Sequence, residues 1–182
     1  MNKEENMEHP NRKRVRLPGF DYDTPGHYFI TLCTTQKQKL LCDIVGTGLP
    51  DGPQVRFTQY GQIALAKLEQ MCDFYDDLKV EKYVIMPNHI HMLIHLTDSG
   101  LYREKNANPT NNRISQFIGT FKRFCNRAYG RNIWQARSYD HVIRGEQDYR
   151  EIWAYIDENP IRWTADRFFI ADGSSNAPPE TM

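Results

Sequence analysis

One stretch near the middle of the chain constrains the fold more than any other. Residues 83–96 read YVIMPNHIHMLIHL, which is two apolar runs separated by a break at Met86-Pro87-Asn88. Apolar runs on either side of a short Pro-Asn break are typical of two strands joined by a tight turn. We therefore predict strands at about 79–86 and 89–96.

The second of these strands should carry two different surfaces, because alternate side chains point to opposite faces of a sheet. His89 and His91 project from one face. The other face is apolar and should be buried, and it consists of Ile90, Met92, Ile94 and Leu96.

The rest of the chain predicts an α+β fold. Aromatic and β-branched residues indicate a first strand, apolar residues at helical spacing indicate three helices, and a last strand or two short pieces of one precede the third helix. These elements lie at 27–35, 60–75, 114–129, 133–144 and 147–159. Together with the central pair they give a ferredoxin-like (RRM-like) split βαβ order, an antiparallel four-stranded sheet with two helices on one face, followed by a C-terminal helix.

Length and composition limit the remaining choices. A chain of 182 residues fits one domain, and we expect a disordered arm at 1–11, a domain at 12–163 and a largely disordered tail at 164–182. The glycine- and proline-rich stretch 42–58 should be an irregular loop with a short hairpin near 55–57, and 97–111 a long polar loop. Four scattered cysteines without a CxxC motif suit a cytoplasmic protein. No apolar run approaches the ~20 residues of a membrane helix.

The net charge of zero hides an uneven distribution of basic residues. A basic half can bind nucleic acid although the sum is neutral, but such residues can also be ordinary solvated faces. Basic clusters occur near the start of the chain and in the second predicted helix: Arg12, Lys13, Arg14 and Arg16, then Lys122, Arg123 and Arg127.

The His-Ile-His triplet is a candidate metal site. His89 and His91 on one strand face have Cα atoms roughly 6.6 Å apart, so both imidazoles can reach one divalent ion. His95 lies roughly 13 Å along the strand from His91, which is too far for the same ion. A metal site needs a third ligand, and two histidines on a half-exposed strand are the alternative.

The third predicted helix offers that ligand. Tyr155 and Asn159 are four residues apart and therefore share one helical face, which flanks the buried stripe. Asn159 has a carbonyl oxygen for an ion, and Tyr155 a hydroxyl for a substrate held on it. Spacing alone does not distinguish Tyr155 from a core tyrosine, since the chain has ten tyrosines.

These motifs, taken in order, resemble those of the REP-associated tyrosine transposases, a branch of the single-tyrosine HUH transposases. The matching stretches are RLPGFDY at 16–22, YFIT at 28–31, MPNHIH at 86–91, FK at 121–122, WQ at 134–135, YDHVIR at 139–144 and YIDENP at 155–160. The resemblance covers about residues 12–163. The segments 42–58 and 97–111 carry no matching motif.

The resemblance implies a role for each of these residues. His89, His91 and Asn159 would hold Mg²⁺ or Mn²⁺, although relatives commonly carry glutamine at the last position. Tyr155 would attack a scissile phosphate, giving a 5′-phosphotyrosine link and a free 3′-OH. The substrate implied is single-stranded DNA with hairpins, bound by a monomer or a homodimer. The basic clusters would follow the DNA backbone, and His141 would contact DNA or support the site, unless it is purely structural.

Three other functions compete with this hypothesis. A domesticated protein would bind hairpin DNA without cleaving it, although such a protein would not need His89, His91 and Tyr155 together. A relaxase or replication-initiator nickase uses similar residues, but the sequence around Tyr155 fits the transposase branch better. A metallohydrolase would need a carboxylate ligand near the histidines, and spacing places none there.

Overall fold

The computed structural model describes residues 20–46, 52–98 and 112–171. Its centre is an antiparallel sheet of four strands in the order β4-β5-β1-β6. These strands span Gly26–Cys33 (β1), Leu78–Met86 (β4), His89–Leu96 (β5) and Tyr139–Val142 (β6). A separate hairpin pairs β2 (Cys42–Val45) with β3 (Gln54–Phe57). The α+β fold, the four-stranded sheet and the short hairpin were predicted from the sequence and are confirmed.

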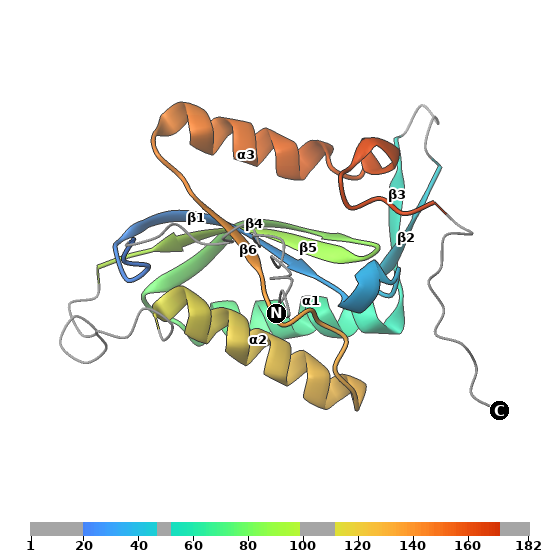
Figure 1. Ribbon diagram of the computed structural model, residues 1–182, viewed down its shortest axis with the longest axis horizontal. Helices are drawn as coiled ribbons and strands as arrows, with labels where there is room; N and C mark the ends of the chain where they lie inside the picture. The colour runs from blue at the N-terminus through green and yellow to red at the C-terminus, as the bar shows by residue number, and fades with distance from the viewer. Residues whose placement is uncertain (1–19, 47–51, 99–111, 172–182) are drawn as a thin grey trace, which may run out of the picture.

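Three α-helices form the outer layers of the molecule. Figure 1 shows α1 (Gln59–Cys72) and α2 (Arg113–Tyr129) together on one face of the sheet and α3 (Glu146–Glu158) on the opposite face. Two short 3₁₀ helices, η1 (Thr35–Lys37) and η2 (Trp163–Ala165), complete the described elements. No helix in the described ranges is both long and apolar enough to cross a membrane.

The main core lies between the sheet and the pair α1 and α2. The alternation expected for β5 is observed, since Ile90, Met92 and Ile94 are fully buried on this side. Strand β1 adds Tyr28, Ile30 and Leu32, and α2 adds Phe117 and Phe121. The opposite face of the sheet carries a much smaller apolar cluster, in which Phe29 and Leu93 meet Ile156 of α3. Helix α3 therefore rests on a sheet surface that is left largely to polar side chains.

Side-chain caps fix the beginnings of two helices. The Thr58 hydroxyl accepts a hydrogen bond from the Gly61 amide (3.2 Å) at the start of α1, and Asn112 Oδ1 accepts one from the Ser115 amide (2.9 Å) at the start of α2. Each satisfies a backbone donor that the first helical turn leaves unpaired. Gly130 ends α2 in the left-handed conformation, with φ of 69°.

The boundaries differ by more than two residues from the sequence prediction in two places. Helix α1 ends at Cys72, and Tyr75 reaches the core from the following turn, where its ring packs against Phe117. Within the predicted strand segment 133–144, only residues 139–142 form a strand, β6, which pairs with β1. Trp134 makes just an isolated bridge to Thr34. The predicted arm at 1–11, the loop at 99–111 and the tail from 172 lie outside the described residues.

Candidate active site

The turn between β4 and β5 orients the first histidine. The fully buried Asn88 side chain donates from Nδ2 to the carbonyl oxygens of Lys37 (3.2 Å) and Phe168 (2.8 Å). Its Oδ1 lies 2.8 Å from His89 Nδ1. An amide oxygen only accepts, so Nδ1 of His89 carries the proton and Nε2 has a free lone pair. The Pro87-Asn88 turn thus fixes both the direction and the tautomer of His89.

The second histidine is held from the neighbouring strand. His91 lies opposite Thr31 in the β1–β5 register, and its Nδ1 is 2.8 Å from the Thr31 hydroxyl oxygen. Its Nε2 is 3.3 Å from the hydroxyl oxygen of Tyr155. The rings of His89 and His91 are 4.4 Å apart between centroids. Both histidines are fully buried, which differs from the half-exposed strand considered above, because α3 and the chain after it cover them.

Helix α3 brings Tyr155 and Asn159 to this histidine pair, as their spacing predicts. The ring of Tyr155 lies 5.2 Å from that of His91. Asn159 is almost fully buried, and its Nδ2 donates to Asp166 Oδ2 (3.2 Å). Two buried atoms here have no hydrogen-bond partner among the described residues, namely His89 Nε2 and Asn159 Oδ1.

A carboxylate that sequence reasoning missed completes the cluster. Asp166 follows η2, and its Oδ2 accepts a hydrogen bond from the Tyr155 hydroxyl (3.1 Å). Donor atoms of Asp166, His89 and His91 all lie within 4.8 Å of one another. Asp166 falls in the segment from 164 that we expected to be largely disordered. The sequence signal near Asp166 is the aromatic pair Phe168-Phe169, and in the structure the Phe168 ring is buried 4.6 Å from the His89 ring.

Burial controls the protonation of these groups. It lowers the pKa of His89 to about 4 and holds that of His91 well below its usual value, so both imidazoles are neutral at pH 7. Burial, with Asp166 beside it, raises the pKa of Tyr155 to about 12. The tyrosine therefore stays protonated until a cation or a base acts on it.

The residues present fit a divalent metal ion. Neutral imidazoles are the form that binds metals, and outer partners such as Asn88 and Thr31 commonly orient such ligands. Unpaired buried acceptors are costly, and the two found here belong to the residues expected to be ligands. The donor set comprises His89, His91 and Asn159, with Asp166 beside them.

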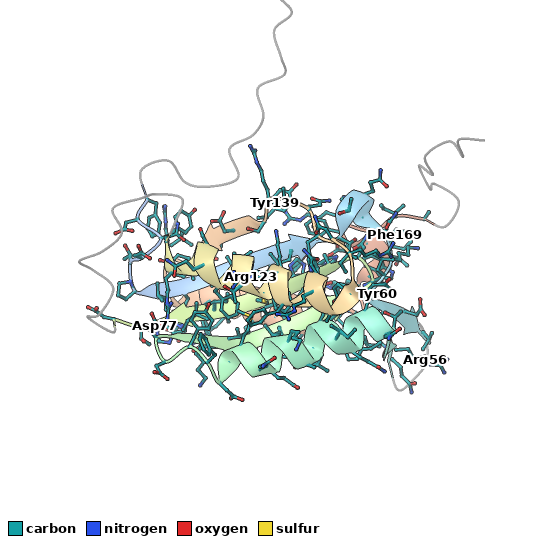
Figure 2. The ribbon with its side chains drawn as sticks, turned by 90° about the horizontal axis from the view of Figure 1, so that it is seen from below. Arg56, Tyr60, Asp77, Arg123, Tyr139 and Phe169 are labelled. Carbon is teal, nitrogen blue, oxygen red and sulfur yellow. The ribbon has the colours of Figure 1, made fainter. Side chains whose placement is uncertain are left out.

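The other predicted residues lie elsewhere. His141 of β6 pairs with Asp148 in the first turn of α3 (2.9 Å) rather than with the histidine pair. Lys122 donates to the carbonyl oxygens of Gln135 (2.7 Å) and Ala136 (3.3 Å), and burial lowers its pKa to about 8. Arg123, labelled in Figure 2, and Arg127 are exposed on α2. This helix lies on the opposite face of the sheet from α3, which carries Tyr155 (Figure 1). Arg12, Lys13, Arg14 and Arg16 lie outside the described residues.

Known proteins resemble this chain in sequence and in fold. No protein-family model matches the sequence. The chain is 27% identical to an uncharacterized protein of Haemophilus influenzae over 88% of this chain and 94% of that protein. It is also 27% identical to the REP-associated tyrosine transposase of Escherichia coli K12, over 60% of this chain and 59% of that protein. A solved REP-associated tyrosine transposase, bound to a REP hairpin, shares the fold with a TM-score of 0.56 and 22% identity, over 76% of this chain and 68% of that one.

The chain is similar in sequence to one REP-associated tyrosine transposase and in fold to another. The resemblance drawn from the sequence motifs is thereby confirmed. The shared fold is the four-stranded antiparallel sheet with its three helices. The E. coli relative is matched over little more than half of its length, so the resemblance describes the fold better than the whole protein's activity.

Proposed function

We propose that this protein is a divalent-metal-dependent endonuclease and strand transferase that acts on single-stranded hairpin DNA through Tyr155. The single observation that carries the proposal is the position of the Tyr155 hydroxyl. It lies 3.3 Å from Nε2 of His91 and 3.1 Å from the carboxylate of Asp166, beside two unpaired acceptors on His89 and Asn159. A nucleophile next to a donor set for a cation is the arrangement that metal-assisted phosphoryl transfer requires.

His89, His91 and Asn159 would hold the ion, which we propose is Mg²⁺ or Mn²⁺. When bound, it supplies Lewis-acid polarisation of the scissile phosphate. The Tyr155 oxygen forms a bond to phosphorus, and the bond from phosphorus to the 3′-oxygen breaks. This leaves a 5′-phosphotyrosine link and, once the leaving oxygen takes a proton from solvent, a free 3′-OH. Attack by a 3′-OH on that link reverses the step and joins strands.

Asp166 is positioned to accept the phenolic proton. Its Oδ2 already accepts the hydroxyl hydrogen bond, and the raised pKa of Tyr155 means that the nucleophile needs a proton acceptor near neutral pH. We therefore assign Asp166 as the general base. Thr31 and Asn88 act through the histidines and are positioning residues.

A basic and aromatic rim beside the site suggests where the DNA strand enters. Tyr139 is about half-exposed, and the Arg167 guanidinium lies 6.0 Å from its ring and 4.6 Å from that of Phe168. Lys37 lies over the same Phe168 ring at 5.2 Å. Unpaired bases stack on aromatic side chains while cations follow the phosphates. We propose that the single-stranded flank of the hairpin crosses this rim.

Several predictions remain part of the proposal. The protein is expected to act in the cytoplasm as a monomer or a homodimer, with residues 12–163 as the transposase domain. Arg123 and Arg127 can contact the same DNA only if it passes around an edge of the sheet, since they lie on the α2 side.

A cleavage assay with labelled DNA tests the proposal. Single-stranded hairpins taken from the DNA that flanks the protein's own gene are incubated with the full chain and Mn²⁺, and covalent adducts are separated on denaturing gels. Tyr155→Phe should abolish the adduct. Tyr83→Phe is the matched control, because Tyr83 is a partly exposed tyrosine of β4 that belongs to neither histidine cluster, and its adduct should form normally. Hairpin binding without any adduct in the wild type would favour the binding-only alternative.

A further inference from the structure

A second pair of histidines occupies the same face of the sheet, further along β5. His27 of β1 and His95 of β5 are direct partners in the antiparallel register. Partners in such a ladder have Cβ atoms about 4.5–5.5 Å apart, close enough for two imidazoles to share a ligand. Their rings stack with centroids 4.3 Å apart and planes at 10°. Neither residue takes part in the site proposed above.

An irregularity in β4 turns a carboxylate toward this pair. The β4–β5 register shifts between Val80, which faces Ile94, and Lys82, which faces Leu93, so that Glu81 is an extra residue. A bulge of this kind redirects side chains. As a result, Lys82 reaches Asp157 of α3 (2.6 Å) while its neighbour Glu81 also points to the α3 side.

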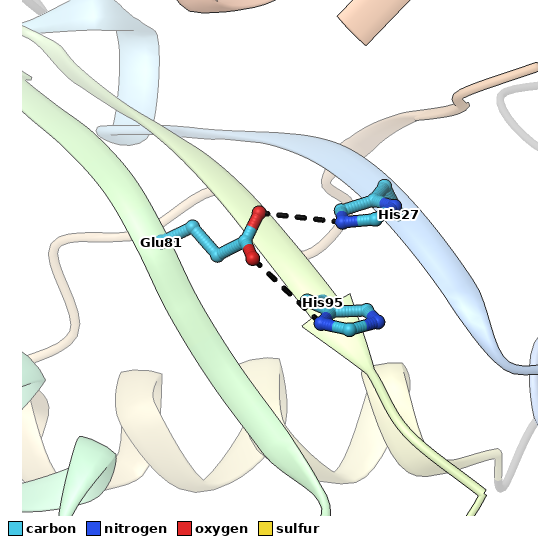
Figure 3. Close-up of side chains that lie close together, drawn as sticks. All are labelled: His27, Glu81 and His95. Carbon is cyan, nitrogen blue, oxygen red and sulfur yellow. Dashed lines mark ion pairs between the residues drawn. The ribbon is translucent and has the colours of Figure 1, made fainter. Parts of the chain in front are cut away.

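Three donor groups therefore converge from three adjacent strands. Glu81 Oε2 lies 3.3 Å from His27 Nε2, and Glu81 Oε1 lies 3.7 Å from His95 Nδ1 (Figure 3). Donor atoms of the three residues all lie within 4.8 Å of one another. The exposed fraction of the side chain is 33% for His27, 34% for His95 and 19% for Glu81, so an ion can reach them from solvent.

A tyrosine of α3 orients the carboxylate from above. The Tyr149 hydroxyl donates to Glu81 Oε2 (3.0 Å), and its ring meets that of His27 edge-on at 5.0 Å. A ligand carboxylate is commonly hydrogen-bonded by a second residue in this way. The same helix thus places Tyr149 over this cluster and Tyr155 over the first.

We propose that His27, His95 and Glu81 form a second metal site, which takes a first-row transition ion of the Zn²⁺ type. Two imidazole nitrogens and one carboxylate suit Zn²⁺, whereas Mg²⁺ prefers a shell of oxygens. One nitrogen of each ring faces the Glu81 carboxylate, so the three donor groups already face one another.

This ion and the catalytic ion are separate. His95 and His91 are four residues apart on one strand, or roughly 13 Å, whereas paired catalytic metals sit about 3.5–4 Å apart. The second ion cross-links β1, β4 and β5 through one side chain from each strand. Through Tyr149 it also fixes the first half of α3, the helix that carries Tyr155.

Metal stoichiometry tests the site without any measurement of cleavage. The full chain is stripped with a chelator, titrated with Zn²⁺ and analysed by equilibrium dialysis. A His89→Ala/His91→Ala variant removes the first donor set and should still bind one Zn²⁺ per chain. Adding His95→Ala to that variant should weaken this binding at least tenfold. Adding His141→Ala instead is the control and should leave Zn²⁺ binding unchanged. His141 also pairs with a carboxylate, that of Asp148, but it belongs to neither cluster of three donors.

A conservative variant guards against misfolding. Glu81→Gln in the same background retains an acceptor for Tyr149 but loses the charged ligand, and it should also weaken Zn²⁺ binding at least tenfold while the circular dichroism spectrum stays unchanged. If the His89→Ala/His91→Ala variant is folded and binds no Zn²⁺, or if both Glu81→Gln and His95→Ala leave its affinity intact, the second site is refuted. These outcomes are independent of whether Tyr155 forms an adduct.

Discussion

The two histidine pairs on the α3 face of the sheet are built differently, although they share strand β5 and helix α3. His89 and His91 come from one strand, two residues apart, and are fully buried. His27 and His95 come from facing strands and stay about one-third exposed. In the first pair each Nδ1 faces a polar side chain, whereas in the second pair one nitrogen of each ring faces Glu81.

The difference shows in what each pair leaves unsatisfied. The first cluster keeps unpaired acceptors on His89 and Asn159, and a buried group without a partner costs about 1–3 kcal/mol. In the second cluster, the Glu81 carboxylate faces both rings and accepts from Tyr149. The first cluster therefore has acceptors free for the proposed cation. In the second cluster the polar groups already contact one another, so an ion can bind only by replacing the contacts of Glu81 with the two histidines.

The largest expected effect separates the two pairs by activity. His89→Ala should abolish adduct formation with hairpin DNA, because it removes a proposed ligand of the catalytic ion. His95→Ala should retain adduct formation within about tenfold of the wild type. His95 affects cleavage only through the position of α3, and the loss of a residue that merely orients a site typically costs about 10–100-fold. Initial rates in Mn²⁺ measure both. Equal losses in the two variants would mean that the pairs form one functional unit.

Removing the proposed base should have the next largest effect. Asp166→Asn keeps the shape of the side chain but cannot take the phenolic proton, so the cleavage rate should fall about 10²–10⁴-fold. Single-turnover cleavage at saturating Mn²⁺ measures this step. A variant with a normal rate would show that Asp166 only holds Tyr155 and Asn159 in place.

The outer partner of His91 should matter less. Thr31→Val removes the hydroxyl beside His91 Nδ1 while it preserves shape and β propensity, and the affinity for Mn²⁺ should fall about 10–100-fold. The Mn²⁺ dependence of the cleavage rate measures the affinity. Recovery of the full rate at high Mn²⁺ would assign the loss to binding, and a rate that stays low would point to misplacement of the ring.

The second pair should respond to Zn²⁺ by a smaller effect on stability. In the His89→Ala/His91→Ala background, Zn²⁺ at a hundred times its dissociation constant should stabilise the fold by about 2.7 kcal/mol, less whatever Zn²⁺ binds the unfolded chain. Thermal melts with and without Zn²⁺ measure this shift. Adding Glu81→Gln should remove it, and an undiminished shift in that variant would place the ion elsewhere.

The sequence predicted the first cluster far better than the second, for physical reasons. Strand alternation places His89 and His91 on one face, and helical spacing brings Tyr155 and Asn159 together, because these are local periodicities. The partnership of His27 with His95 depends on strand register, which no local pattern contains. The bulge at Glu81 breaks the alternation of β4, and regular alternation would send either Glu81 or Lys82, but not both, to the α3 side.

Asp166 was beyond prediction for a related reason. It reaches the site because the chain after α3 folds back, where the Phe168 amide and carbonyl bind Asp166 and Asn88. Such long-range packing also explains why His89 is buried rather than half-exposed. The fold class, by contrast, follows from the order of periodic segments, and only the ends of α1 and of the last strand differ from expectation by more than two residues.

The most direct test of the account is to locate the covalent link between protein and DNA. The wild-type chain is reacted with hairpin DNA and Mn²⁺, the adduct is digested with trypsin and nuclease, and the modified peptide is identified by mass spectrometry. The account predicts a nucleotide phosphate on Tyr155 and on no other residue. Cleaved DNA with a free 5′-phosphate and unmodified Tyr155, or a link at another tyrosine, would contradict it.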